Sequence, residues 1–279
     1  MTKLTTPGEI KLDTTNQVSM NRRQLLSGLA AGTVVAFTIT GCSTNPVTGR
    51  DQFILVSDQQ LAQLGRQTWQ ALLADSTVQD VDAKQTTELR EIGDRIVAAA
   101  GPNVPRSDWD YRVFDDEQIN AFVMPGGKVG FYDGILDIMD NDSQVAAVMG
   151  HEVGHVAGRH AAERYSQQLA AGVALTATSI ALSQADVQYA GQIGAVLGVG
   201  LQFGVLLPYS RRHEIEADRL GMRYMAAAGY DPRENLKFWE KMMEQGEKRQ
   251  KPPEFLSTHP SDETRIRVLT EELKRIEAA

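Results

Sequence analysis

The 279-residue sequence is poor in cysteine, in positive charge and in long hydrophobic runs. Its one cysteine, Cys42, excludes an internal disulfide and fits attachment of a lipid through a thioether better than redox chemistry. The 36 acidic and 28 basic residues give a formal net charge of −8, which argues against nucleic acid as a partner and against attraction to anionic lipid. The chain also lacks an internal repeat.

The amino-terminal segment is typical of an export signal. An apolar run of about 15 residues, 25–39, is shorter than the roughly 20 that a membrane-spanning helix needs, so a single span is disfavoured. Arg22-Arg23 precedes this run and Gly41-Cys42 follows it, as in a lipoprotein signal. We therefore expect residues 1–41 to be removed and Cys42 to carry the lipid. The start at Met1 or Met20, and secretory or twin-arginine export, stay open.

The rest of the chain predicts a lipidated terminus and linker at 42–57, followed by one domain at 58–279. Apolar residues at helical spacing indicate helices from 58, over about 81–100 and 232–248, and at the carboxyl end. Alternating residues between 109 and 132 indicate strands. The expected class is α+β and predominantly helical, with a small antiparallel sheet.

The most informative pattern is His151-Glu152-Val153-Gly154-His155. On a helix, residues four apart differ by about 40° in azimuth, so both imidazoles can bind one metal ion while Glu152 takes a proton from water. Such a string also occurs by chance on exposed helices. The apolar residues around it indicate a buried helix instead, in which histidines need partners, and an Asp140–Ser143 cluster offers N-caps.

A catalytic zinc site needs a third protein ligand. His160 lies nine residues after His151, about 180° around a continuing helix, so we expect it to be structural. Ala161 stands where a metzincin has its third histidine. Glu214 and Asp218 are better candidates, because like charges at i and i+4 repel unless a cation or proton lies between them. The alternative is an exposed helix paired with arginines.

The HEVGH sequence of 151–155 and the EIEADRLG sequence of 214–221 together resemble the paired signatures of the HtpX and CAAX-prenyl-protease family of zinc peptidases. Further pieces of the resemblance lie at 45–50, 120–127 and 258–260, so it spans most of the chain. It is strongest to the soluble, lipid-anchored bacterial members of the family.

The resemblance implies a zincin-type fold with one zinc ion per chain. The expected zinc ligands are His151, His155 and Glu214. Glu152 is then the general base and Asp218 a proton donor or a partner of a ligand imidazole. The remaining acid of the second motif, Glu216, is expected to be a bystander.

The strands at 109–132 are expected to present an edge to substrate. A free edge beside a metal can pair with an extended peptide and hold its scissile carbonyl in place. A plain hairpin that closes the core is equally compatible with the spacing, and the family resemblance favours the substrate edge. Its expected residues are Asn120, Ala121, Phe122, Pro125, Gly126 and Gly127.

Two features leave alternatives open. The Gly- and Ala-rich stretch of 170–207 is either a pair of helices packed on the site or a face that contacts lipid or a subunit. His259, directly before Pro260, is either a structural loop histidine or a regulatory fourth ligand that holds the enzyme idle.

The expected function is zinc-dependent cleavage of misfolded or unassembled proteins at the periplasmic face of a bacterial envelope. The expected partners are such proteins, the membrane, through a lipid on Cys42, and outer-membrane assembly machinery. The alternatives are a zinc-stabilised periplasmic chaperone with little proteolysis and a purely structural lipoprotein.

Overall fold

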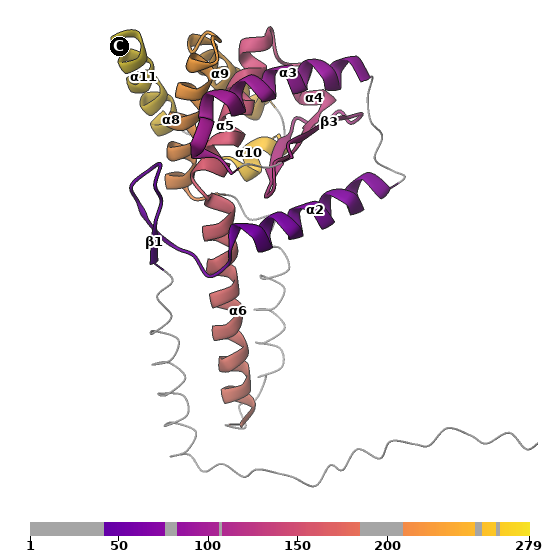
Figure 1. Ribbon diagram of the computed structural model, residues 1–279, viewed down its shortest axis with the longest axis vertical. Coiled ribbons are helices and arrows are strands. Elements are labelled where there is room, and N and C mark those ends of the chain that lie inside the picture. Colours follow the sequence, from indigo (N-terminus) through magenta and orange to yellow (C-terminus); the bar gives the residue numbers. More distant parts are fainter. Residues whose placement is uncertain (1–41, 76–82, 106–107, 185–208, 249–252, 261–262) are drawn as a thin grey trace, which may run out of the picture. The chain divides into compact units, whose positions relative to one another are not determined.

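The computed structural model describes residues 42–75, 83–105, 108–184, 209–248, 253–260 and 263–279 (Figure 1). The expected signal segment and the later part of the apolar stretch, at 185–207, lie outside the described residues. The first part of that stretch continues a helix that begins at His160. Within the described ranges, no helix is both long and apolar enough to cross a membrane.

Helices dominate the described chain and confirm the expected α+β class. The strands are β1 (Cys42–Thr44), β2 (Asp51–Phe53), β3 (Asp110–Phe114), β4 (Ala121–Met124) and β5 (Lys128–Tyr132). The helices are α2 (Asp58–Ala74), α3 (Ala83–Ala100), the 3-10 turn η1 (Gly101–Asn103), α4 (Asp133–Leu136), α5 (Asp142–Ala157), α6 (His160–Gln184), α8 (Arg211–Ala227), α9 (Arg233–Lys248), α10 (Glu254–Thr258) and α11 (Glu263–Glu277).

The three-stranded sheet is mixed, where the sequence suggested an antiparallel one. Its order is β3-β5-β4, with β3 parallel and β4 antiparallel to β5. After β3 the chain passes to the far edge, and the turn at Gly126 and Gly127, with φ of +87° and +74°, returns it to the centre. Alternating residues predict strands but not their direction, so this order could not be derived from spacing.

Residues 42–53 form a packed hairpin, which differs from the expected linker. Strands β1 and β2 pair antiparallel, with Cys42 opposite Phe53. Asn45 and Gln52 are buried, and their side-chain amides donate to the carbonyls of Ala157 and Gly158 at 3.1 and 2.7 Å. Pro46 and Gly49 suggested a loose connection, yet the buried amides need these carbonyls as partners and fasten the hairpin to the end of α5.

Helix α5 lies at the centre of the described domain. The Asn141 side chain accepts from the backbone N–H groups of Ser143 and Gln144 and so caps its first turn. From Ala146 to His155 every residue is buried, because α5 packs against α3, α8, α9 and β4. The helix that carries both motif histidines is therefore part of the core and not a solvated surface helix.

Small residues let α5 and α8 approach until their backbones touch. A Cβ atom on Gly150 would lie 2.7 Å from the carbonyl oxygen of Gly221, and one on Gly154 would lie 2.6 Å from that of Ala217. Both distances are shorter than a carbon–oxygen contact, and the obstacle is backbone that cannot rotate away. Glycine at 150 and 154 is therefore required for this separation of the two helices.

We expect Gly154→Ala to lower the free energy of unfolding of the metal-free protein by about 1–3 kcal/mol, because the added methyl group forces α5 and α8 apart. Urea denaturation measures this. Gly246→Ala on α9 is the matched control, since its Cβ meets only the flexible Leu256 side-chain end. That variant should be neutral or slightly stabilising. Equal stability of the two variants would contradict the close contact.

Candidate metal centre

His151 and His155 project from one face of α5 into the interior. Their exposed fractions are only 1% and 2%, and their Nε2 atoms lie 3.1 Å apart. Glu214, in the first turn of α8, places its Oε2 3.4 Å from His151 Nε2 and its Oε1 3.4 Å from His155 Nε2. The backbone contact between the two helices thus brings residues from two distant motifs into one buried cluster.

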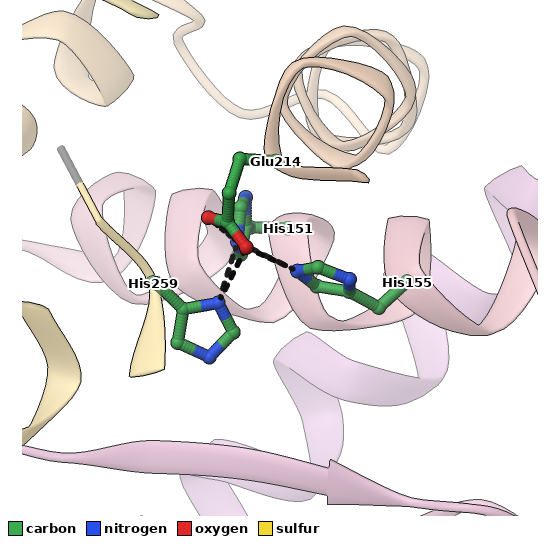
Figure 2. Close-up of side chains that lie close together, drawn as sticks. All are labelled: His151, His155, Glu214 and His259. Atoms are coloured by element: carbon green, nitrogen blue, oxygen red, sulfur yellow. Dashed lines mark hydrogen bonds and ion pairs between the residues drawn. The ribbon is translucent and has the colours of Figure 1, made fainter. Parts of the chain in front are cut away.

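His259 completes the cluster. It follows α10, and its Nδ1 lies 3.2 Å from His151 Nε2 and 3.3 Å from a Glu214 oxygen. One ligand atom from each of these residues and from His155 lies within 4.8 Å of all the others (Figure 2). Three imidazoles and a carboxylate are a donor set that fits zinc and other divalent transition metals.

The hydrogen bonds of the two α5 histidines direct their lone pairs toward one point. His151 Nδ1 lies 2.9 Å from Asp218, a carboxylate that can only accept, and His155 Nδ1 lies 2.9 Å from His160 Nδ1. With a hydrogen on each Nδ1, both Nε2 lone pairs face each other and repel. A cation or a proton between them removes that repulsion, so the donors present fit a metal ion.

The pKa values of the clustered residues also indicate that the cluster favours a positive charge. Burial opposes charge on His151, but hydrogen bonds to Asp218 and Glu214 outweigh it and raise its pKa to about 9. Burial lowers the pKa of His155 well below its usual value. Burial also acts against the Glu214 carboxylate, yet His259 and Arg265 hold its pKa well below normal. The cluster therefore keeps one proton when no metal is bound.

Arg265 on α11 is a residue that sequence reasoning missed. It is 1% exposed, donates twice to Asp218 at 2.7 Å and lies 2.9 Å from Glu214. Its guanidinium also stacks on Trp239 at 3.8 Å. Asp218, expected as a proton donor or a partner of a ligand imidazole, lies between this arginine and His151. Buried arginines are rare, so the burial of Arg265 distinguishes it in the structure. Its burial could not be read from the sequence.

Glu152 lies on α5 between the two histidines. It is 1% exposed, and its Oε1 lies 3.5 Å from His259 Nε2 without a hydrogen bond. Burial raises the pKa of this carboxyl above its usual value, against an opposing backbone hydrogen bond from Val123. A buried carboxylate with a raised pKa and an unused oxygen is suited to accept a proton.

The edge of the sheet faces this carboxylate. Strand β4 pairs only with β5, and Val123 on β4 bonds Glu152 through its backbone. Of the expected edge residues, Pro125 and Gly126 line an apolar cavity beside His155, together with Leu61, Val123, Ala161, Ala162 and Tyr209. Tyr209, which sequence reasoning also missed, stacks on His155 with ring centroids 4.0 Å apart.

The remaining expected edge residues serve the fold. Phe122 packs with Trp69, Phe114 and Tyr132. The Asn120 carbonyl accepts from the backbone of Tyr132, Ala121 is buried in the core, and Gly127 packs on the Trp109 ring. At this edge the backbone of β4, and not the side chains of these residues, faces the candidate site.

His160 and Glu216 differ from their expected roles. Helix α5 ends at Ala157, and Arg159 adopts a left-handed φ of +53°, so the chain turns before α6 begins. His160 is thereby brought back against His155, where a continuous helix would have pointed it away. Glu216 accepts from His160 Nε2 at 3.0 Å and from Arg50 Nε at 2.7 Å. It is no bystander.

Comparison with known proteins agrees with this geometry. A family model described as peptidase family M48 matches residues 83–273. The chain belongs to peptidase family M48. This confirms the peptidase resemblance of the two motifs, and a metal-binding cluster is what a metallopeptidase family requires.

Relatives of this M48 chain include peptidases from mitochondria and bacteria. The mitochondrial metalloendopeptidase OMA1 of Schizosaccharomyces pombe is 38% identical over 179 residues, which are 63% of this chain and 50% of that protein. The beta-barrel assembly-enhancing protease of Escherichia coli is 29% identical over 257 residues, 88% of this chain and 52% of that protein. The chain thus spans about half the length of these two relatives.

We expect Arg265→Met to lower the free energy of unfolding of the metal-free protein by about 3–5 kcal/mol, because it leaves two buried carboxylates without their cation. Thermal and urea denaturation measure the loss. Arg275→Met is the control. The Arg275 side chain lies on the same helix beside Glu272 and is 60% exposed, so this change should cost under about 1 kcal/mol. Similar losses in both variants would show that Arg265 does not hold the cluster.

Proposed function

We propose that the chain is a zinc-dependent metalloendopeptidase. The observation that carries this proposal is the buried convergence of two α5 imidazoles and the Glu214 carboxylate, next to Glu152, whose Oε1 has no hydrogen bond. His151, His155 and Glu214 would hold the ion. A zinc ion held there supplies Lewis acidity to a water molecule and to the scissile carbonyl.

The chain's own residues supply the remaining steps. Glu152 takes a proton from the attacking water and passes it toward the leaving amine, because its pKa is raised and no hydrogen bond occupies its Oε1. Asp218 fixes the tautomer and orientation of His151 and does not itself give up a proton, since Arg265 holds it ionised. The edge of β4 holds an extended segment of substrate by backbone pairing.

His259 is proposed to hold the enzyme idle. Its Nδ1 lies among the ligand atoms and its Nε2 faces Glu152, so it fills the space that a water molecule needs beside the base. Two imidazoles and a carboxylate already satisfy a catalytic zinc site with one open position. Activity would then require the His259 side chain to move away from the cluster.

The proposed substrates are misfolded or unassembled envelope proteins. Pairing through a strand edge selects extended, unfolded chains over folded ones and depends little on sequence. The proposed location is the periplasmic face of a bacterial envelope, where a lipid on Cys42 would attach the chain to the membrane. Substitution of Cys42 is the direct test of this attachment. The likeness to the beta-barrel assembly-enhancing protease supports outer-membrane assembly machinery as a partner.

We expect Glu152→Gln to abolish cleavage of casein while zinc stays bound at one equivalent, because the amide keeps the shape of the carboxylate but cannot accept a proton. Metal analysis and a proteolysis assay on the same preparation measure both. Glu240→Gln, an exposed change on α9, should leave the rate unchanged. Full activity of Glu152→Gln would exclude this residue as the base. If this variant also rescued a deletion strain fully, a chaperone role would replace proteolysis.

We expect His259→Ala to speed casein cleavage severalfold at saturating zinc and to weaken zinc retention, because one imidazole leaves the cluster and frees a position for water. Initial rates at several zinc concentrations separate the two effects. A rate that falls at saturating zinc would assign His259 a direct part in the reaction instead of an idling one.

A further inference from the structure

A row of hydrogen bonds leads from the amino-terminal hairpin to the candidate ligand His155. Arg50 donates through Nε to Glu216 at 2.7 Å, and Glu216 accepts from His160 Nε2 at 3.0 Å. His160 Nδ1 then lies 2.9 Å from His155 Nδ1. His155 and His160 are buried, and Arg50 and Glu216 are mostly so, with side-chain exposures of 14% and 16%.

The donors along this row can be arranged in one way only. Glu216 already accepts from Arg50 and, as a carboxylate, has no hydrogen to give, so His160 must donate to it through Nε2. A neutral His160 then has a lone pair on Nδ1 and accepts there. His155 must therefore carry its hydrogen on Nδ1, which leaves the Nε2 lone pair directed at the metal centre. Glu216, which Arg50 holds in place as a carboxylate, thus selects through His160 the tautomer of His155 that binds a metal.

The other α5 histidine has a matching arrangement. His151 donates to Asp218, and Asp218 accepts two hydrogen bonds from Arg265. Each candidate imidazole ligand is therefore held by a carboxylate that an arginine fixes in turn. The two arrangements differ in that His160 stands between His155 and its carboxylate, and that Arg50 comes from the amino-terminal hairpin whereas Arg265 lies on α11.

Fastening the hairpin does not by itself explain the contact between Arg50 and Glu216. The buried side chains of Asn45 and Gln52 already bind the carbonyls at the end of α5. Arg50 also binds Glu163 on α6 through both terminal nitrogens, at 2.9 and 2.6 Å. Its Nε is directed separately at Glu216, the carboxylate that bonds His160 among the residues described.

We infer that Arg50 is a positioning residue for the metal centre, which acts on His155 through Glu216 and His160. The inference rests on the proposed metal-binding function. It assigns to the hairpin that begins at Cys42 a part in metal binding that lies outside both peptidase motifs. Partners of this kind orient a ligand imidazole and raise its basicity, and their loss weakens metal binding.

The test is the zinc dissociation constant of the full chain, measured by competition with a chromophoric chelator. We expect Arg50→Gln and His160→Phe each to weaken zinc binding about 10- to 100-fold. Because Arg50 acts through His160, the double variant should bind zinc no more weakly than His160→Phe alone. The visible spectrum of the cobalt-substituted protein should shift in the same variants.

Arg223→Gln is the matched control. It makes the same charge change on α8, where Arg223 pairs with Glu272 away from the cluster, and should leave zinc affinity and the cobalt spectrum unchanged. If Arg50→Gln fails to fold, the shape-conserving Glu216→Gln interrupts the same row. Unchanged zinc affinity in these variants, or losses of Arg50 and His160 that multiply in the double variant, would overturn the inference. A wild-type chain that binds no zinc would instead overturn the proposed function.

Discussion

The metal centre depends on the backbone contact between α5 and α8. Gly150 meets Gly221 and Gly154 meets Ala217, so the two helices run in opposite directions with matched four-residue spacing. Because the motif histidines and the α8 acids are also four residues apart, this register sets His151 against Asp218 and both imidazoles against Glu214. Any larger separation of the helices would break every one of these distances together.

Charge imposes the second constraint. Glu214 and Asp218 are both fully buried carboxylates, and Arg265 supplies one positive charge between them. One negative charge remains on these two residues, and their hydrogen bonds raise the pKa of His151, which favours a proton on that imidazole. A divalent ion replaces that proton and also separates the lone pairs of the two α5 histidines. Because buried carboxylates are unfavourable without a compensating positive charge, the burial of Glu214 and Asp218 itself favours a cation at the site.

The sequence predicted the parts of the site that follow from local spacing. The i, i+4 histidines, the acids of the second motif and the N-cap at Asn141 all act within one helix, and periodicity suffices to find them. The direction of His160 was predicted wrongly because the chain turns after α5 through a left-handed Arg159, and arginine at this position does not predict such a turn. Arg50 and Arg265 were missed because their partners Glu216 and Asp218 lie 166 and 47 positions away, and an arginine on an amphipathic helix or hairpin usually faces solvent. The parallel pairing of β3 with β5 was also missed, because alternating residues do not determine the order or direction of strands.

Both ends of the described domain are required to complete its centre. Arg50 precedes α2 and Arg265 lies on the last helix, yet both close hydrogen-bond rows that start at the α5 histidines. Contacts of such long sequence separation cost chain entropy, which the buried hydrogen bonds and ion pairs at the centre must offset. A chain whose hairpin or last helix is still undocked therefore has imidazoles that are neither oriented nor charge-balanced. The proposed cleavage of unfolded proteins therefore requires both ends of the described domain to be docked, because the candidate metal centre is incomplete without the hairpin and the last helix.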